Sequence, residues 1–329
     1  MKILITGGAG FIGGHLAKSL SADGEEVHLL DNLKRGVKDK FIEDCIAGGN
    51  VSLVYADLND VDSMAALDSD YDVIYHLAAI IGVGHVLKRP YEVLTANVRM
   101  TENVITLARR QKNLKRLLFS STSEVYAGSL IYMDMPIPTP ETMPIALTEL
   151  SEPRTSYMLS KLYGECMCNM SQLPFTNIRL HNVYGPRMGM SHVIPELLYK
   201  AWCLKDGASL DVYSVDHMRT FCYVSDAVRM MRGLIDSAEA EGKTVNIGNQ
   251  SPEITIGELA NVVVSTVGRN LELVPKPATP GSPSRRCPST KLLNELTGIS
   301  GLVDLRNGVQ QTYDWYLDNV FINDGVTAK

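Results

Sequence analysis

The sequence of 329 residues lacks several features that would place it in other classes of protein. No apolar run approaches the roughly 20 residues needed to span a bilayer. No stretch concentrates Lys and Arg, and the formal net charge is −6, so neither nucleic acid nor an anionic membrane is expected as a partner. The N-terminus begins with a strand-like segment and shows no charged-then-apolar signal peptide, so we expect a cytoplasmic protein.

Cysteines at metal-ligand spacing are also missing. The six cysteines are scattered and form no C-x-x-C pair: Cys45, Cys166, Cys168, Cys203, Cys222 and Cys287. Such cysteines are typical of free, mostly buried thiols in a reducing compartment, and we expect no metal site. The composition, 45% hydrophobic and 21% charged, suits an enzyme with either one large domain and a sizeable lobe or two domains.

Glycines follow a buried strand at the N-terminus. Lys2–Thr6 is a short apolar run typical of a parallel strand, and a helical stretch begins near Gly14. Between them, Gly7, Gly10 and Gly13 match G-x-x-G-x-x-G, and Gly8, Gly10 and Gly13 match G-x-G-x-x-G. These glycines permit a tight turn and a close backbone approach to a pyrophosphate at the helix N-terminus. The segment therefore predicts a dinucleotide site.

An acidic residue ends the next predicted strand, Glu26–Leu30. Asp31 lies where a dinucleotide-binding unit needs a carboxylate for the adenosine ribose hydroxyls. Because a carboxylate repels a 2′-phosphate, Asp31 favours NAD over NADP. Arg35 is close enough in sequence to weaken that preference.

Tyr157 and Lys161 form the most informative pair in the chain. Positions i and i+4 share one helix face, so a phenol and an ammonium can point at one ligand. A phenol has an ordinary pKa of about 10, and a nearby cation lowers it toward the working range. Such a pair can remove a proton from an alcohol while a hydride leaves its carbon. The spacing alone is not specific, since it also occurs on solvated helices.

Strands and helices alternate through the first half of the chain, which predicts an α/β fold with a Rossmann-type doubly wound parallel sheet. The segment Met133–Pro144 holds four prolines and is expected to form a loop over the site. The further strands are predicted at Val51–Asp57, Tyr71–Ala79, a segment beginning Leu117–Ser120, and Phe175–Leu180, with a long helix at about Tyr91–Gln111.

After the strand at Phe175–Leu180 the alternation becomes irregular. We therefore predict an NAD-binding Rossmann domain over residues 1–181, which includes the helix of Tyr157. Residues 182–329 are expected to form mainly a smaller C-terminal substrate-binding lobe, with the chain returning to the sheet near 244–247.

These segments resemble the extended short-chain dehydrogenase/reductases of the NAD-dependent nucleotide-sugar epimerase/dehydratase group. The resemblance runs from Met1 to about Tyr316 and is specific for the superfamily, less so for the reaction. The motifs that carry it are Thr6–Gly13, Asp31-Asn32-Leu33, Asp57-Leu58, His76-Leu77-Ala78-Ala79, Ser121-Thr122-Ser123-Glu124-Val125-Tyr126, Tyr157-x-x-x-Lys161, Asn182–Arg187 and Arg219–Val224.

The resemblance implies a role for each matching side chain. Thr122 would bind the sugar C4 hydroxyl, Tyr157 would deprotonate it while NAD takes the C4 hydride, and Lys161 would bind the nicotinamide ribose. A nucleotide-diphosphate sugar would contact Ser123, Asn182, Arg187, Arg219 and Arg286. The other NAD contacts would be Gly7, Gly10, Phe11, Ile12, Gly13, Asp31, Asn32, Asp57, Leu58, Leu77, Ala78, Ala79 and Asn97. A guanidinium suits phosphate, although each arginine alone could equally be a solvated surface charge.

Glu124 bears on the reaction that follows C4 oxidation. A 4,6-dehydratase typically has an Asp-Glu pair at this position, but here Ser123 precedes Glu124 and leaves one carboxylate. That weakens dehydration, because the leaving C6 hydroxyl lacks its proton donor. Thr122-Ser123-Glu124 resembles UDP-glucuronate decarboxylases and is compatible with 4-epimerases. Glu124 could instead cap the next segment by accepting backbone N–H bonds.

The sequence departs from the family pattern near the expected sugar pocket. His181 precedes Asn182 where many relatives have an aromatic residue such as phenylalanine. Ala127 follows Tyr126 where glycine is usual, and the segment Gly128–Met133 is expected to be an atypical loop. These differences bear on the identity of the substrate more than on the use of NAD.

The favoured interpretation is a nucleotide-sugar epimerase that acts through a transient 4-keto intermediate in the synthesis of sugar-nucleotide or surface-polysaccharide precursors. The alternatives are a decarboxylating or dehydrating lyase and a net 4-dehydrogenase with the same first step. A non-catalytic sensor is disfavoured because Tyr157 and Lys161 are both present. The nucleotide and the sugar stay open.

A homodimer is implied by the resemblance, since the helices that carry Asn97 and Tyr157 match the family's dimer interface. Apolar positions on the second helix could serve that interface or the core equally well: Met158, Leu162, Met167 and Met170.

Overall fold

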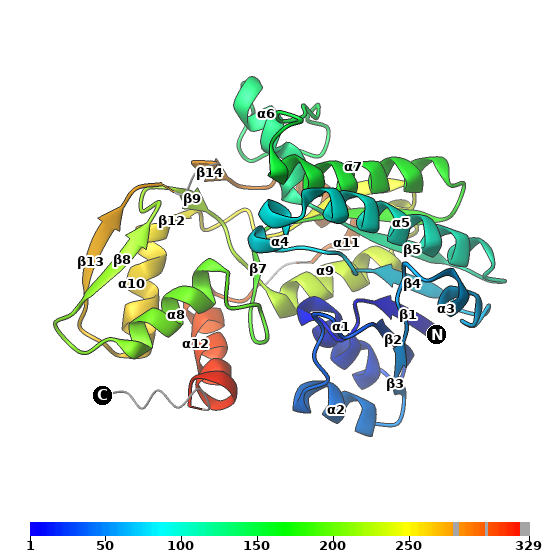
Figure 1. The fold of residues 1–329 in the computed structure, drawn as a ribbon, viewed down its shortest axis with the longest axis horizontal. Coiled ribbons are helices and arrows are strands. Elements are labelled where there is room, and N and C mark those ends of the chain that lie inside the picture. The colour runs from blue at the N-terminus through cyan, green and yellow to red at the C-terminus, as the bar shows by residue number, and fades with distance from the viewer. Residues whose placement is uncertain (279–282, 300–301, 323–329) are drawn as a thin grey trace.

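A seven-stranded parallel sheet dominates the computed structural model, which describes residues 1–278, 283–299 and 302–322 (Figure 1). The strand order is β11-β6-β5-β4-β1-β2-β3, so the order reverses on the two sides of β1. This arrangement confirms the predicted Rossmann-type doubly wound fold. The strands are β1 Lys2–Thr6, β2 Glu26–Asp31, β3 Val51–Tyr55, β4 Val73–His76, β5 Arg116–Thr122, β6 Phe175–Leu180 and β11 Lys243–Ile247.

Alternating side chains of the sheet supply two hydrophobic cores. Ile3 and Ile5 of β1 lie in one core with apolar residues of α1 and α9. Leu4, between them, lies in the other core with residues of α5 and α7. Successive strand residues point to opposite faces, so helices cover both sides of the sheet. These helices are α1 Phe11–Ala22, α5 Pro90–Arg109, α7 Pro153–Met170 and α9 Val224–Asp236.

A smaller region of helices and short strands stands beside the sheet, on the left of Figure 1. Its two-stranded parallel sheet pairs β8 with β13, and α8, α10 and α12 pack together next to it. A three-stranded sheet in the order β12-β9-β14 connects this region with the end of the main sheet. The bounds are β8 Ser209–Tyr213, β9 Met218–Arg219, β12 Ile254–Thr255, β13 Glu272–Lys276, β14 Arg285–Arg286, α8 Val193–Cys203, α10 Ile256–Val267 and α12 Leu305–Tyr316.

The chain returns to the main sheet late in the sequence. β11 pairs in parallel with β6, and α9 packs on α1. Segments beyond residue 182 thus also belong to the sheet and its helical cover. The division into 1–181 and 182–329 stays a prediction, and residues 323–329 lie outside the described residues.

Three segments differ from the interpretation of the sequence. The third strand stops at Tyr55 and does not reach Asp57. The fourth strand covers only Val73–His76, because the Ala78 N–H donates to the Thr6 side chain (3.3 Å). The expected loop Gly128–Met133 forms the helix α6, Ala127–Tyr132. The Ser129 hydroxyl holds α6 to the proline-rich loop by donating to the Pro144 carbonyl (2.7 Å).

Shorter elements complete the structure. They are the helices α2 Lys40–Ala47, α3 Val61–Ala65, α4 Val83–Lys88 and α11 Lys291–Thr297, the 3-10 helices η1 Ser123–Tyr126 and η2 Ala238–Ala240, the π-helix η3 Leu317–Phe321, and the strand pair β7 Val183–Tyr184 with β10 Cys222–Tyr223. Within the described part of the chain, no helix has both the length and the apolar character needed to cross a bilayer.

A buried ion pair joins α7 to the sheet. Arg179 on β6 donates from Nε to Glu165 Oε1 (3.0 Å) and from Nη2 to Oε2 (2.8 Å). Ser121, near the end of β5, donates its hydroxyl proton to the same carboxylate. Both charged side chains are buried, and the two-point geometry makes the pair strong and directional. One carboxylate thus connects α7, β5 and β6.

Replacing Arg179 with Met should destabilise the protein, because Glu165 would be left as an unpaired buried charge. We expect the free energy of unfolding to fall by about 3–5 kcal/mol in urea titrations. The double variant Arg179→Met/Glu165→Leu should recover much of this loss. The control Lys291→Met, which removes an exposed pair with Glu295, should change stability by less than about 0.5 kcal/mol. A double variant no more stable than Arg179→Met would contradict the assignment.

Candidate active site

The glycine-rich turn follows β1 and leads directly into α1. Gly7 has a φ of 69°, and a Cβ there would lie 2.9 Å from the Ala78 backbone. A Cβ on Gly13 would lie 2.5 Å from the Gly7 carbonyl oxygen. The helix begins at Phe11 and Ile12, and its N-cap, Gly10, makes no side-chain capping bond. The first-turn N–H groups therefore remain for an anion, so this tight turn fits a dinucleotide pyrophosphate.

Asp31 lies beside this turn at the carboxyl end of β2. Its carboxylate accepts hydrogen bonds from the Ala9 N–H (3.1 Å) and the Leu33 N–H (2.8 Å). Burial raises the pKa of Asp31, and these two bonds oppose that shift. A carboxylate fixed at this place suits the ribose hydroxyls of a bound dinucleotide.

The predicted adenine contacts lie next to Asp31. Asn32 donates from Nδ2 to Asp57 Oδ2 (3.1 Å), and Lys34 donates to the same oxygen (2.9 Å). Burial would raise the pKa of Asp57, but hydrogen bonds, first from the Asn59 N–H and then from Lys34, lower it to about 2. Leu58 is buried directly behind. The structure thus brings Asn32, Asp57 and Leu58 to one end of the sheet.

The segment after β4, Leu77-Ala78-Ala79, runs past the glycine-rich turn. The Leu77 N–H donates to the Thr6 carbonyl at 3.2 Å. Asn97 on α5 holds the next residue, since its Oδ1 accepts from Ile80 N (2.7 Å) and its Nδ2 donates to Ile80 O (3.1 Å). That Asn97 also contacts NAD stays a prediction. Its amide is used to fix the backbone beside the cofactor turn.

Tyr157 and Lys161 lie on α7 facing the end of β5. Lys161 donates from Nζ to the Ser120 carbonyl (2.7 Å), and this nitrogen lies 6.0 Å from the centre of the Tyr157 ring. Burial lowers the pKa of Lys161 to about 8. The Thr122 side chain lies close enough to the Tyr157 side chain to lower its pKa. The predicted group Thr122, Tyr157 and Lys161 is thus assembled.

The electrostatics of Tyr157 differ from the simple expectation. Burial, and then the negative charge of Glu124, raise the pKa of Tyr157 above its ordinary value. The Thr122 side chain and the charge of Arg35 act in the opposite direction. Arg35 donates to the Ile81 carbonyl (2.8 Å). Cationic help for the phenolate therefore comes from a residue that the sequence analysis considered only for its effect on cofactor choice.

Ser123 and Glu124 meet an arginine from the other end of the chain. Arg286 on β14 donates from Nη1 to Glu124 Oε1 (2.9 Å) and to Ser123 Oγ (3.2 Å). The Arg286 charge, the largest influence, holds the pKa of Glu124 below its ordinary value. The Glu124 N–H donates to Thr122 Oγ1 (3.3 Å), so Thr122 caps η1, and the Glu124 carboxylate reaches Arg286. The alternative that Glu124 serves only as a cap is wrong.

Arg219 and Arg286 are neighbours across two strands. β14 pairs in parallel with β9, and these two residues are register partners. Arg219 donates to the carbonyls of Met218 and Pro283. Burial, and then the charge of Arg286, lower the pKa of Arg219 to about 10. Like charges placed opposite each other repel, so the pair suits an anion such as a diphosphate.

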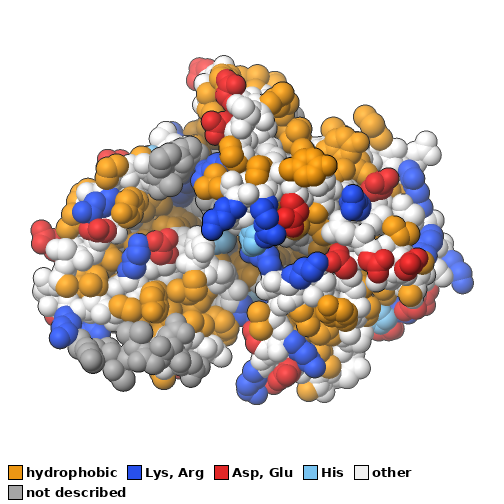
Figure 2. Space-filling model, viewed as in Figure 1, with side chains coloured by type: hydrophobic (Ala, Val, Ile, Leu, Met, Phe, Trp, Pro, Cys, Tyr) orange, Lys and Arg blue, Asp and Glu red, His pale blue; other side chains and the backbone are white. Residues whose placement is uncertain are grey.

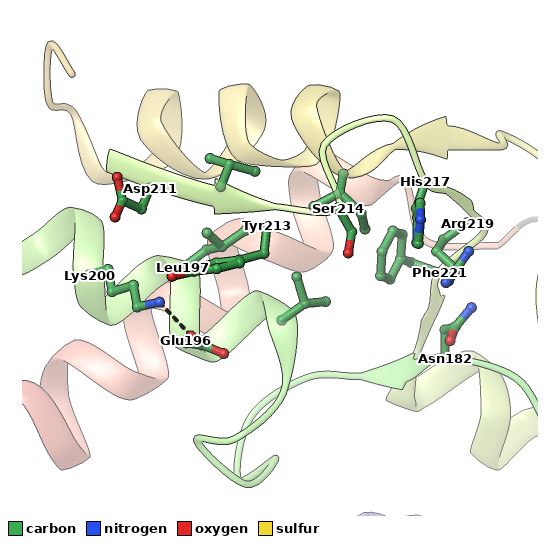
Figure 3. A pocket seen from close by; sticks show the side chains of 13 residues that line it. Asn182, Glu196, Leu197, Lys200, Asp211, Tyr213, Ser214, His217, Arg219 and Phe221 are labelled. Carbon is green, nitrogen blue, oxygen red and sulfur yellow. Dashed lines mark hydrogen bonds and ion pairs between the residues drawn. The ribbon is translucent and has the colours of Figure 1, made fainter. Parts of the chain in front are cut away.

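A cavity of about 270 Å³ begins beside Arg219 and extends toward α8 and β8 (Figure 3). Asn182 lies at the same end of the cavity as Arg219, and its Nδ2 donates to the Thr220 carbonyl (2.9 Å). The remaining lining residues are Val193, Glu196, Leu197, Lys200, Asp211, Val212, Tyr213, Ser214, His217, Phe221 and Ile256. Figure 2 shows Lys, Arg and His side chains gathered at the hollow between the two parts of the molecule.

Of the residues that line this cavity, only Asn182 and Arg219 were predicted as site residues from the sequence. The other lining residues come from α8, from β8 and the segment that follows it, and from the first residue of α10, Ile256. One signal was present, because Ser209–Tyr213 alternates exposed and buried residues and is followed at once by a polar turn that leads to Arg219.

Arg187 does not join the other arginines. It donates to Asp39 Oδ2 (2.8 Å), the Gly10 carbonyl (3.0 Å) and the Ala9 carbonyl (3.1 Å). That Arg187 binds substrate stays a prediction. Its guanidinium braces the glycine-rich turn from the side of Asp39.

Comparison with known proteins agrees with this geometry. The family described as "NAD dependent epimerase/dehydratase family" matches residues 3–248. The chain belongs to this family. The family uses NAD, as the glycine-rich turn and Asp31 predict, so the cofactor prediction is confirmed.

Individual relatives of this epimerase/dehydratase family member differ in activity. The chain is 32% identical to a UDP-N-acetyl-alpha-D-glucosaminuronate decarboxylase of Bacillus cytotoxicus, over 96% of this chain and 97% of that protein. It is 32% identical to UDP-glucuronic acid decarboxylase 1 of Xenopus tropicalis, over 96% and 72%. The structure of a UDP-glucuronic acid 4-epimerase from Bacillus cereus matches with a TM-score of 0.82 and 25% identity, over 97% and 99%.

Replacing Asp31 with Asn should weaken NAD binding, because the neutral amide is a poorer acceptor for the ribose hydroxyls. We expect the Kd for NAD to rise about tenfold and the preference over NADP to narrow, since the repulsion of a 2′-phosphate is removed. Calorimetric titration with each dinucleotide measures both changes. The control is Asp68→Asn, which removes a surface ion pair with Lys2. This variant should bind NAD with unchanged affinity. Unchanged selectivity in Asp31→Asn would contradict the role.

Proposed function

We propose that the protein decarboxylates a nucleotide-linked hexuronic acid through transient oxidation at sugar C4. The observation that carries this proposal is the contact of Arg286 with Ser123 and Glu124 next to Thr122 and Tyr157. This contact supports decarboxylation, because a sugar carboxylate bound near Thr122 and Tyr157 would meet the Arg286 cation. The decarboxylase relatives support this choice over the epimerase that the sequence analysis favoured.

The first step uses Tyr157 and Thr122. Thr122 orients the C4 hydroxyl, and Tyr157 accepts its proton as the C4–H bond breaks. NAD held at the glycine-rich turn and Asp31 would supply hydride-transfer chemistry at C4. Lys161 would hold the cofactor side of the site, and Arg35 supplies positive charge near the phenolate. Because burial raises the pKa of Tyr157, proton transfer depends on the positive charges around it.

The second step follows from the 4-keto group. The C5–C6 bond electrons move toward the C4 carbonyl as carbon dioxide leaves, and C5 then gains a proton from solvent. Arg286 holds the departing carboxylate, and Glu124, kept ionised by Arg286, accepts hydrogen bonds from the sugar. Carbon dioxide leaves without being protonated, so one carboxylate is enough here. Tyr157 finally returns its proton to the C4 oxygen.

The diphosphate and the nucleotide are proposed to bind beyond the sugar. Arg219 and Arg286 would contact the diphosphate, and the cavity beside Asn182 would take the base. The cavity walls include the ring of Phe221 and the aliphatic Leu197, which suit a flat, partly apolar base.

A 4-epimerase of a nucleotide-linked uronic acid is the second candidate. The structural similarity to the UDP-glucuronic acid 4-epimerase of Bacillus cereus favours it. In that reaction Arg286 would hold the sugar carboxylate while the 4-keto sugar rotates, and the hydride would return to its opposite face. Dehydration remains disfavoured, because Ser123 takes the place of the second acid.

A homodimer also stays a prediction. α5 and α7 lie side by side, and on the described surface they expose Tyr91, Tyr163 and Met170. By contrast, Met158 is buried in the protein itself. The exposed residues are the ones that a partner could cover.

Mass spectrometry of products should distinguish the two reactions. With UDP-glucuronate or UDP-N-acetylglucosaminuronate, we expect a product lighter by the mass of carbon dioxide. UDP-glucose should give no such product, because its sugar has no carboxylate to lose. Tyr157→Phe should lower turnover by at least about a thousandfold, since it removes the C4 base. A product of unchanged mass and new retention time would establish the epimerase instead.

Replacing Arg286 with Met should shift the pH dependence of turnover. Without the cation, the pKa of Glu124 rises, so the acid limb of the kcat profile should move to higher pH. We also expect kcat to fall about a hundredfold at the optimum. The control Arg285→Met removes only an exposed pair with Glu253 and should keep the normal profile. Identical acid limbs in the two variants would rule out the Glu124–Arg286 coupling.

A further inference from the structure

A chain of buried hydrogen bonds starts from the Glu165–Arg179 ion pair. Arg179 donates from Nη1 to the Tyr126 hydroxyl (2.7 Å). Since a guanidinium can only donate, that hydroxyl must use its own proton elsewhere, and its partner is Asn246 Oδ1 (3.1 Å). The Asn246 Nδ2 group donates to the carbonyls of Thr139 (3.1 Å) and Ser289 (3.3 Å). These two carbonyls determine which end of the Asn246 amide is oxygen.

The orientation of Asn246 fixes the tautomer of His181. His181 Nε2 lies 3.1 Å from Asn246 Oδ1, which can only accept, so Nε2 must carry the proton. Burial lowers the pKa of His181 to about 3, so the ring is neutral. Nδ1 is therefore a bare acceptor. It is buried and has no hydrogen-bond partner within residues 1–278, 283–299 and 302–322.

A complementary group lies nearby on β14. Arg286 Nε is a buried donor that also has no partner among the described residues. A Cβ added to Gly248 would lie 2.9 Å from His181 Cβ and 3.1 Å from Pro288 Cγ. Pro288, two residues after Arg286, therefore lies close to His181, and Arg286 itself is near enough for its charge to act on the His181 ring. Buried polar atoms are almost always satisfied, and a bound water can join a donor to an acceptor that do not meet directly.

We propose that His181 is a positioning residue for Arg286. Its bare Nδ1 accepts a hydrogen bond from a bound water that in turn accepts from Arg286 Nε–H, and this link holds the guanidinium over Ser123 and Glu124. The series of hydrogen bonds from Arg179 through Tyr126 and Asn246 keeps the His181 ring in the tautomer whose Nδ1 can accept this bond. The proposal rests on the proposed function only for the task of Arg286.

Three substitutions separate the two ring nitrogens. The Oδ1 atom of His181→Asn can replace Nδ1, whereas the amide of His181→Gln reaches only the position of Nε2. We expect kcat to stay within about threefold for His181→Asn and to fall about tenfold for His181→Gln and His181→Phe, with little change in KM. His28→Phe, at a half-buried histidine bonded to Tyr71, is the control. Equal losses in the Asn and Phe variants would overturn the proposal.

Nitrogen NMR of the full-length protein tests the same contact without substrate. Long-range ¹H–¹⁵N spectra should show His181 protonated at Nε2 and hydrogen-bonded at an unprotonated Nδ1. Arg286→Met should move the Nδ1 resonance toward that of a free acceptor, whereas Arg285→Met should leave it unchanged. A proton on Nδ1, or an Nδ1 resonance that ignores Arg286→Met, would refute the proposal. These signals decide it even if no nucleotide sugar is decarboxylated.

Discussion

The buried ion pair between Glu165 and Arg179 holds the reacting parts of this protein together. Glu165 lies on the helix that carries Tyr157 and Lys161, two turns after the tyrosine. The Glu165 carboxylate accepts a hydrogen bond from Ser121 at the end of β5. Its partner Arg179 donates to the hydroxyl of Tyr126, the last residue of η1. Thr122, Ser123 and Glu124 lie between those two points. In a low-dielectric interior such directional bonds are strong, so the tyrosine and the strand end keep one relative position.

The cofactor side could be read from the sequence because its parts are contiguous. A buried strand, three glycines and a helix occupy about twenty residues, and their order alone determines a turn that fits pyrophosphate. Asp31 and Asp57 could be predicted in the same way, because each ends an apolar, strand-like segment of the sequence. The contacts of Asn97 with Ile80 and of Arg187 with Asp39 could not be predicted, because tertiary packing sets these partners. A side chain's motif position does not show which way its amide or guanidinium points.

The substrate side was only partly accessible for the same reason. Arg286 reaches Glu124 across 162 positions of sequence, through strands of two residues that are too short to show any periodicity. The resemblance to the family named both residues, but the sequence carried no sign that they touch. His181 stood out only as a departure from the family pattern. Its tautomer follows from Asn246, Tyr126 and Arg179, which no local pattern connects.

Arg286 links the two chemical steps through Glu124. The negative charge of Glu124 raises the pKa of Tyr157, which lowers the population of the phenolate that would accept the C4 proton. Arg286 pairs with that charge and so offsets the penalty, in addition to facing the place proposed for the sugar carboxylate. In the proposed mechanism, a residue that sets the position of Arg286 would therefore bear on both C4 oxidation and the loss of carbon dioxide. Because carbon dioxide leaves without a proton donor, one carboxylate and one arginine would be enough for decarboxylation, whereas dehydration must also protonate a leaving hydroxyl.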